Sequence, residues 1–348
     1  MNPWIFGGSG RCGKTSMVLA LNGKEGKIIG FQLEGLFAAY SEKYPVVFSN
    51  RIKKILITQY LQRPRYVDVE RLKSKKPIAF FTTPLDDILN SIEFNSNNIV
   101  PIIASTLDIF AKDNNCETWA AYDLLPEFYF HRFLKYRPKI NFATMLRDPR
   151  ESIAAMLHWR CYPKPPENRD IRFKHSLIIW CLSIQTGLHL RKKYPKNFKV
   201  FSFNRIINND NDEINRISKD IGVSSSLIKE YFSFEPFFTF DSFKGHKTPQ
   251  GGWDNKLLTQ LEYYQIDQLC KPFLREVENS LMPKTEVQIV KKLNGFIIFS
   301  KVVLLIGKLS PRFAKLIVDM RYFPKRRVFR FINISLDFFK NLLNLIIK

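Results

Sequence analysis

A glycine-rich segment near the start of the chain has the residue types and spacing of a phosphate-binding loop. Residues 8–15 (GSGRCGKT) match the pattern G-x-x-x-x-G-K-[ST] at every position. Glycines let backbone N–H groups approach phosphate oxygens, and a helix that starts directly after the loop points its positive dipole at the same anion. Lys14 adds a positive charge, and the hydroxyls of Thr15 and Ser16 add hydrogen-bond donors. The segment therefore predicts that the chain binds a phosphorylated nucleotide.

A second cluster of polar residues follows an expected strand in the middle of the chain. The apolar run at 140–146 is followed by RDPRES at 147–152. Asp148 suits an N-cap and Pro149 suits the first helical position, so a helix is expected to start here. Arg147 then lies at the carboxyl end of the strand, on the same edge as the glycine-rich loop, where its guanidinium can hold a second phosphate. The alternative role for Arg147 is a structural ion pair with a nearby carboxylate.

Together these two motifs resemble those of the sulfotransferase superfamily, whose members transfer a sulfuryl group from 3′-phosphoadenosine 5′-phosphosulfate (PAPS). The resemblance covers roughly residues 3–282. It implies that the first loop holds the 5′-phosphosulfate, that Arg11 stabilises charge on the transferred group, and that Arg147 binds the 3′-phosphate. The family commonly has a serine where this chain has Ala155, and Ser152 is the expected replacement. The residues that the two motifs assign to the nucleotide are Gly10, Arg11, Cys12, Gly13, Lys14, Thr15, Ser16, Arg147 and Ser152.

A basic, glycine-containing segment at 244–257 resembles a late loop of the same family. Lys244 and Lys247 are then candidates to close over the 3′-phosphate, together with Gly252. Trp253 is expected to pack against the core or the adenine. Solvated lysines on a surface loop are the alternative interpretation.

Three acidic residues are candidates for the general base that removes the proton of the acceptor. Glu34 follows the strand expected at 27–31, about where many glycan- and protein-modifying members of the family place a catalytic glutamate. With Arg11 and Lys14 it would complete the catalytic set. Asp123 and Glu127 are the alternative bases, and an exposed acid at a helix start is the alternative role for Glu34.

A kinase or other P-loop enzyme that uses Mg·ATP is the main alternative activity, because Lys14 is typical of nucleoside triphosphatases. Phosphoryl transfer needs Mg²⁺, which is usually held in part by an acidic residue directly after an apolar strand. The strands expected at 140–146 and 198–203 are followed instead by Arg147 and Asn204. This pattern favours sulfuryl transfer without a metal. A non-enzymatic nucleotide- or nucleic-acid-binding protein is the third interpretation, and two phosphate motifs at matching strand ends disfavour it.

Apolar strands that alternate with helical stretches must position these residues. Strands are expected at 27–31, 98–104, 140–146 and 198–203, and helices at 126–136, 149–159 and 173–194. The alternation predicts an α/β P-loop domain over residues 1–282, with three layers and a mainly parallel central sheet flanked by helices. Residues 283–348 are expected to form a basic, amphipathic, helical extension.

The chain is strongly basic, with 54 Lys and Arg, 32 Asp and Glu, and a formal net charge of +22. Such a balance predicts polyanionic partners. Fourteen of the cations lie at 284–348 among apolar residues, against three acids. The extension is therefore expected either to pack on the core or a second subunit, or to lie on an anionic membrane surface. Five scattered cysteines and five histidines without ligand spacing predict neither a disulfide framework nor a metal site.

The glycine-rich loop starts so early that no room is left for a signal peptide, and no segment approaches twenty uninterrupted apolar residues. A cytoplasmic location is expected, with a peripheral position at the inner face of a membrane as the alternative that the extension suggests. A carbohydrate or glycolipid acceptor is expected, because a basic protein rich in aromatic residues suits sugars and acidic groups. No nucleic-acid partner is expected.

Overall fold

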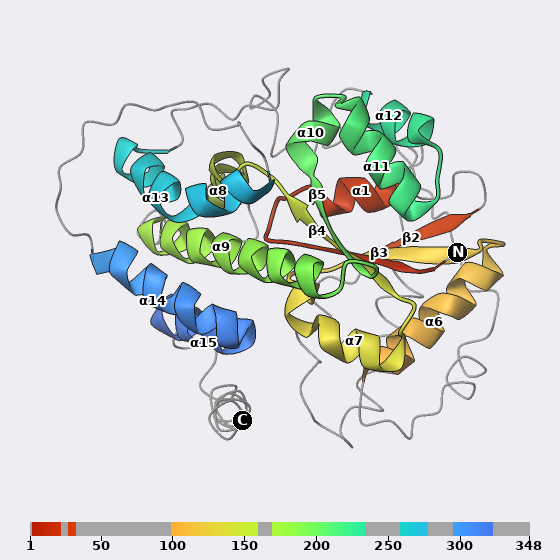
Figure 1. Cartoon of the computed structure of the whole chain (residues 1–348), viewed down its shortest axis with the longest axis horizontal. Coiled ribbons are helices and arrows are strands. Elements are labelled where there is room, and N and C mark those ends of the chain that lie inside the picture. The colour runs from red at the N-terminus through yellow and green to blue at the C-terminus, as the bar shows by residue number, and fades with distance from the viewer. Residues whose placement is uncertain are drawn as a thin grey trace.

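A computed structural model of the chain describes residues 2–21, 27–32, 99–158, 169–233, 258–277 and 295–322. Within these ranges a five-stranded sheet lies at the centre of the fold, in the order β2-β3-β1-β4-β5 (Figure 1). The strands are β1 (Trp4–Gly7), β2 (Ile28–Gln32), β3 (Thr118–Tyr122), β4 (Asn141–Leu146) and β5 (Phe198–Ser202). All neighbouring pairs are parallel. The carboxyl ends of all five strands therefore meet at one edge, where ligands of such sheets bind.

Helices cover both faces of the sheet and give the fold three layers (Figure 1). One face carries α1 (Lys14–Leu21), α10 (Phe203–Ile207), α11 (Asn211–Ile221) and α12 (Ser225–Ser233). The other face carries α6 (Ile99–Asp113), the 3₁₀ helix η3 (Pro126–Tyr129), α7 (Phe130–Tyr136), α8 (Pro149–His158), α9 (Arg169–Lys193) and α13 (Gln260–Val277). On the side of α9 that faces away from the sheet lie α14 (Gly295–Leu309) and α15 (Pro311–Tyr322).

Side chains of β1 alternate between two apolar clusters, as the geometry of a strand requires. Trp4 and Phe6 pack under α1 and α11, and Ile5 packs toward α9. β1 is buried along its whole length because helices cover both of its faces. The glycine-rich loop therefore starts from the central strand of the sheet, which is paired on both sides.

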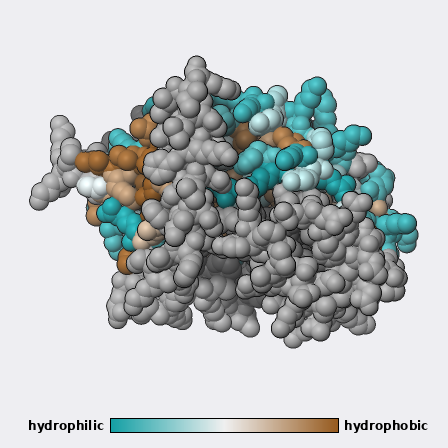
Figure 2. Space-filling model, turned by 90° about the horizontal axis from the view of Figure 1, so that it is seen from below, coloured by the Kyte–Doolittle hydropathy of each residue, from teal (hydrophilic) through white to brown (hydrophobic). Residues whose placement is uncertain are grey.

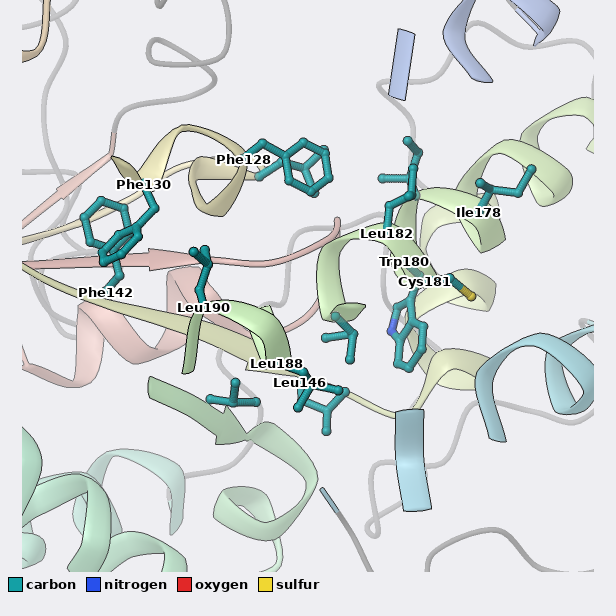
Figure 3. Close-up of a cluster of buried hydrophobic side chains, with 14 of the residues drawn as sticks. Phe128, Phe130, Phe142, Leu146, Ile178, Trp180, Cys181, Leu182, Leu188 and Leu190 are labelled. Atoms are coloured by element: carbon teal, nitrogen blue, oxygen red, sulfur yellow. The ribbon is translucent and has the colours of Figure 1, made fainter. Parts of the chain in front are cut away.

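The 25-residue helix α9 runs through the larger cluster, which Figure 3 shows. Trp180, Leu182 and Leu188 of α9 lie in this cluster with Phe142 and Leu146 of β4. Because α9 packs on the sheet with one side and on α14 and α15 with another, it links the C-terminal helices to the edge that carries the loop.

The first part of the predicted C-terminal extension packs on this core. Gln185 of α9 donates a hydrogen bond to Leu304 O at 3.0 Å, and His175 Nε2 lies 2.9 Å from Asp319 Oδ1. Phe296 and Val318 belong to the same apolar cluster as α9. The extension is thus helical and packs on the core over residues 295–322, while the boundary predicted at 282 lies outside the described residues. None of the described helices combines the length and the apolar character that a membrane span needs.

Most of the expected elements are present. The strands expected at 27–31, 140–146 and 198–203 are β2, β4 and β5, and the helix expected at 173–194 is α9. The helix expected at 126–136 is divided into η3 and α7, and that at 149–159 is α8.

The strand expected at 98–104 is wrong, because this segment starts α6. Pro101 lies in the first turn of that helix, where proline is tolerated because the first N–H groups have no helical partner. The strand β3 was not predicted. Its sequence TWAAY contains two alanines and has a weak strand signal, and it becomes a strand because it pairs on both sides, with β1 and β2.

Candidate nucleotide-binding site

The glycine-rich loop connects the central strand β1 to the first residue of α1 at the carboxyl edge of the sheet. Gly8 and Gly13 have φ values of 119° and 92°, which side chains of L-residues rarely adopt. A Cβ on Gly13 would also lie only 2.0 Å from Cδ2 of Phe203, the first residue of α10. The first helical hydrogen bond of α1 runs from Met17 N to Gly13 O at 3.0 Å. The N–H groups that precede it are those that a helix N-terminus offers to an anion.

Lys14 lies along the inside of the loop. Its Nζ donates to Ser9 O at 2.7 Å and to Gly8 O at 3.4 Å, and the residue is only 8% exposed. The ammonium group is therefore held among the loop carbonyls, close to the backbone that would surround a phosphate. Cys12 is fully buried beside it, and burial raises the pKa of its thiol.

A buried carboxylate of η3 is hydrogen-bonded to the glycine-rich loop. Glu127 of η3 accepts a hydrogen bond from Gly8 N at 3.1 Å on Oε2 and one from the Ser183 hydroxyl of α9 on Oε1. Burial raises the pKa of Glu127, and the hydrogen bond from Ser183 and the charge of Lys14 act in the opposite direction. Both oxygens of this candidate base are engaged with the loop and with α9. The geometry is that of a residue that positions the loop.

Asp123 stands directly after β3, the strand that pairs with β1. Its N–H donates to Phe6 O at 3.1 Å, and its carboxylate accepts from Leu124 N at 2.6 Å. The side chain is almost fully buried. Asp123 is thus an acidic residue directly after a buried strand and beside the loop, a feature that the sequence does not predict because β3 has a weak strand signal. Among the described residues no group of three or more His, Cys, Asp and Glu side chains is placed to hold a metal ion.

Arg147 reaches the loop from the end of β4, as expected from the sequence. Its Nη1 donates to Arg11 O at 3.2 Å, and its Nε pairs with Glu151 at 3.0 Å. Phe203 lies beneath the guanidinium, 5.3 Å from its Cζ to the ring centroid, and Trp180 Nε1 donates to Arg147 O at 3.2 Å. The arginine thus makes the structural ion pair considered for it and also contacts the loop, while its binding of a second phosphate stays a prediction.

The start of α8 has the expected cap, and it also contacts the loop. Asp148 Oδ1 accepts from Arg150 N at 2.8 Å, as an N-cap residue does. Ser152 is fully buried, and its hydroxyl donates to Gly10 O at 2.8 Å. Its observed role is therefore to hold the loop, while its contact with a 3′-phosphate stays a prediction.

The structure places the remaining predicted residues as follows. Gly10, Arg11, Gly13, Thr15 and Ser16 lie in the loop or in the first turn of α1, and the loop is joined to Arg147 and Ser152 by the hydrogen bonds above. Lys244, Lys247, Gly252, Trp253 and the expected base Glu34 lie outside the described residues.

Two residues that shape the site were missed or differently assigned by sequence reasoning. Ser183 carries no local signal, because it lies on a long buried helix. Phe203 is the last residue of the strand expected at 198–203, but in the structure it starts α10 and lies between Gly13 and Arg147. The one feature of the sequence that indicates a role for Phe203 in the site is its position at the end of an expected strand.

The parallel sheet, the loop after its central strand and the helix that follows define an α/β P-loop protein. The sequence matches no protein-family model and no curated protein. Among solved structures, the chain is similar to the sulfotransferase domain of the Synechococcus PCC 7002 olefin synthase, with 13% identity and a TM-score of 0.42 over 87% of this chain and 94% of that one. It is also similar to the sulfotransferase STF9 from Mycobacterium avium, with 10% identity and a TM-score of 0.41 over 80% and 77%. At these values the similarity assigns no activity to the chain.

Proposed function

We propose that this protein is a sulfotransferase that moves a sulfuryl group from PAPS to a hydroxyl or amine acceptor. The observation that supports this best is the hydrogen bond of 3.2 Å from Arg147 Nη1 to Arg11 O. It brings a guanidinium from the end of β4 against the phosphate loop at the end of β1. A nucleotide with phosphates on both the 5′ and 3′ positions needs two such sites on one edge. The resemblance of both motifs to the sulfotransferase superfamily is a second support.

The residues of the loop fit the 5′ end of such a nucleotide. Glycines at positive φ leave room for the backbone N–H groups to approach an anion, and Lys14 is within the loop. An anionic oxygen is a stronger acceptor for its ammonium than the carbonyls of Gly8 and Ser9, so Lys14 is expected to turn toward the phosphosulfate. Arg147 would hold the 3′-phosphate with its guanidinium, whose Nη1 lies against the loop.

PAPS supplies an electrophilic sulfur and a bisphosphate leaving group, so the protein has to orient the acceptor and stabilise charge. A base takes the proton of the acceptor, whose oxygen or nitrogen forms the new bond to sulfur as the bond to the bisphosphate breaks. Arg11, Lys14 and the loop N–H groups would stabilise the charge on the departing group. Glu34 is the proposed base, with Asp123 as the alternative. Glu127 is better suited to hold the loop.

The proposed acceptor is a carbohydrate or glycolipid. A basic protein with 31 Phe, 13 Tyr and 5 Trp suits sugars that carry acidic groups. This part of the proposal rests on composition, and a screen of sulfated products from glycan and lipid extracts supplied with labelled PAPS would test it.

A second candidate is a phosphotransferase that uses Mg·ATP, and Asp123 is the observation that favours it. This acid lies at the end of β3 beside the loop, which is where a P-loop enzyme can place a ligand of Mg²⁺. The absence of such an acid was one reason to prefer sulfuryl transfer, and that reason no longer holds. The position of Arg147 still favours a nucleotide with a 3′-phosphate.

Calorimetry with adenosine 3′,5′-bisphosphate and with Mg·ATP separates the two candidates. We expect the bisphosphate to bind more tightly, and Arg147→Ala to weaken its binding by roughly 10- to 100-fold, since a hydrogen-bonded charge contributes about 1.5–3 kcal/mol. Binding of adenosine 5′-phosphate should change by less than about threefold, because that ligand lacks the 3′-phosphate. Arg205→Ala is the matched control. It removes a cation after β5 that is paired with Asp210.

Tight binding of Mg·ATP without measurable binding of the bisphosphate would exclude the sulfotransferase proposal. Equal losses for the two adenosine ligands in Arg147→Ala would show that Arg147 only supports the loop.

A further inference from the structure

The outer face of α14 carries a stripe of exposed apolar side chains. Of the seven large hydrophobic residues that are exposed in the described part of the chain, four lie on this helix. They are Ile298 (46% exposed), Val302 (51%), Leu305 (64%) and Leu309 (53%). Their spacing of four, three and four residues places them on one face of the helix. We call these four residues the α14 stripe.

The opposite face of α14 is fixed to the core, so the helix has no freedom to bury the stripe by rotation. Phe296, Val303 and Gly307 are buried. Gln185 of α9 donates to Leu304 O at 3.0 Å, and a Cβ on Gly307 would lie 2.5 Å from Cδ2 of Leu182. α14 therefore lies along the surface with one apolar face inside and another outside. Figure 2 shows hydrophobic residues gathered at the left of the molecule, the side on which Figure 1 places α14.

The charged residues of α14 and α15 themselves are mostly cations. The sequence of α14 and α15 contains five Lys and Arg residues and a single acid, Asp319. Asp319 is buried, and its carboxylate is bound to His175 and Lys315. Lys301 and Lys308 of α14 are exposed and alternate with the stripe residues along the helix. Beyond α15, the sequence of residues 323–348 adds six cations and one acid.

We propose that the α14 stripe docks on an anionic membrane surface. An apolar face flanked by lysines is what an interfacial helix presents, with the apolar side chains among the acyl chains and the ammonium groups at the lipid phosphates. Charge complementarity decides between this partner and a second copy of the chain. Two copies that met through this face would bring the exposed lysines of α14 together. An exposed acid that lies near these helices, Asp170 of α9, is already paired with Lys174. The proposal does not depend on the reaction that the P-loop site catalyses.

Co-sedimentation of the full chain with vesicles tests the proposal directly. Vesicles of phosphatidylcholine with phosphatidylglycerol should bind the protein, and vesicles of phosphatidylcholine alone should bind it far less. Val302→Gln with Leu305→Gln should weaken binding to the anionic vesicles at least about tenfold, because two exposed side chains no longer enter the apolar layer. Lys301→Gln with Lys308→Gln should weaken it by roughly fivefold per cation.

Leu261→Gln is the matched control, because Leu261 is a 59% exposed leucine on α13 and lies outside the stripe. It should bind vesicles within about twofold of the unmodified chain, by the usual independence of distant sites. Circular dichroism and the thermal midpoint check that every variant is folded. All replaced residues are exposed, so these values should hardly change.

Two results would overturn the proposal. The first is a failure of the unmodified chain to bind anionic vesicles. The second is equal vesicle binding by the double variant of Val302 and Leu305; if light scattering also shows a dimer that this variant dissociates, the stripe is a contact between two copies.

Discussion

The carboxylate of Glu127 is expected to determine the stability of the phosphate loop, and two replacements separate its hydrogen bonds from its charge. Glu127→Ala removes the acceptor of Gly8 N–H, a bond of 3.1 Å, together with the partner of the Ser183 hydroxyl. Glu127→Gln preserves the shape. Its amide oxygen can accept from Gly8 and its NH₂ group can donate to Ser183, because a hydroxyl both donates and accepts.

The sizes of the two effects follow from burial. Glu127 is 2% exposed, so in Glu127→Ala the Gly8 N–H is left buried without an acceptor, which costs about 1–3 kcal/mol. The lost side-chain carbons add a cavity, and the total is about 2–4 kcal/mol. Glu127→Gln leaves no donor unpaired and should stay within about 1 kcal/mol of the unmodified protein near neutral pH.

The pH dependence distinguishes the charge from the hydrogen bonds. Burial raises the folded-state pKa of Glu127 above its value in the unfolded chain. The folded state then holds its proton more tightly, so this group stabilises the fold at low pH, and its contribution is lost as the pH rises through the folded-state pKa. The amide side chain of the Glu127→Gln variant has no proton to lose in this range. The stability of that variant relative to the unmodified chain should therefore increase with pH, starting from the unfolded carboxyl pKa of about 4.3.

Urea unfolding followed by circular dichroism from pH 4 to pH 8 measures both effects. Glu262→Gln is the control, because Glu262 of α13 is also buried but accepts hydrogen bonds from Arg169 of α9 and from Thr259 N, away from the loop. A loss below about 0.5 kcal/mol in Glu127→Ala would refute the argument from the Gly8 hydrogen bond. A difference between Glu127→Gln and the unmodified chain that is flat or falls with pH would refute the argument from the buried charge.

Two further predictions concern glycines that have close neighbours. Gly13→Ala should lower the free energy of unfolding by about 2–4 kcal/mol and abolish nucleotide binding, because its φ of 92° is strained for alanine and its Cβ would overlap the ring of Phe203. Gly13→Ala with Phe203→Ala should cost less than the sum of the two single changes in urea unfolding, and simple additivity would argue against the contact. Gly307→Val should cost about 1–3 kcal/mol, because its side chain would overlap Leu182 of α9. Gly295→Val is its control, since a Cβ there has no neighbour within 4 Å, and similar losses for both would mean that α14 is not packed as described.

The local features of the site could be predicted from the sequence because they depend on neighbouring residues. The loop follows from glycines whose backbone angles other residues avoid, and from a helix that starts directly after the last of them. The start of α8 follows from Asp148 and Pro149, which favour a helix N-terminus in any context. The place of Arg147 at the loop edge follows from the rule that parallel strands end at the same side of a sheet.

Predictions that depended on one segment without its partners were less successful. The residues at 98–104 are apolar enough for a strand, but residues 99–104 begin α6, a helix that packs on β3 and α7. In β3 the tertiary structure creates a strand that the sequence does not predict, because two neighbouring strands stabilise a segment with little strand preference. Because β3 was missed, Asp123 was considered only as a base and not as an acid beside the loop.

A glycine-rich loop between a strand and a helix, an arginine at a second strand end and an α/β fold could thus be predicted from the order of the residues, because each depends on short-range backbone preferences and on the alternation of strands and helices. The surroundings of that loop depend on tertiary packing instead. Gly8 meets Glu127 across 119 residues and Gly10 meets Ser152 across 142, and such contacts arise when strands and helices pack so that buried polar groups find partners. The same packing determines which face of α14 is buried on α9 and which apolar face remains exposed.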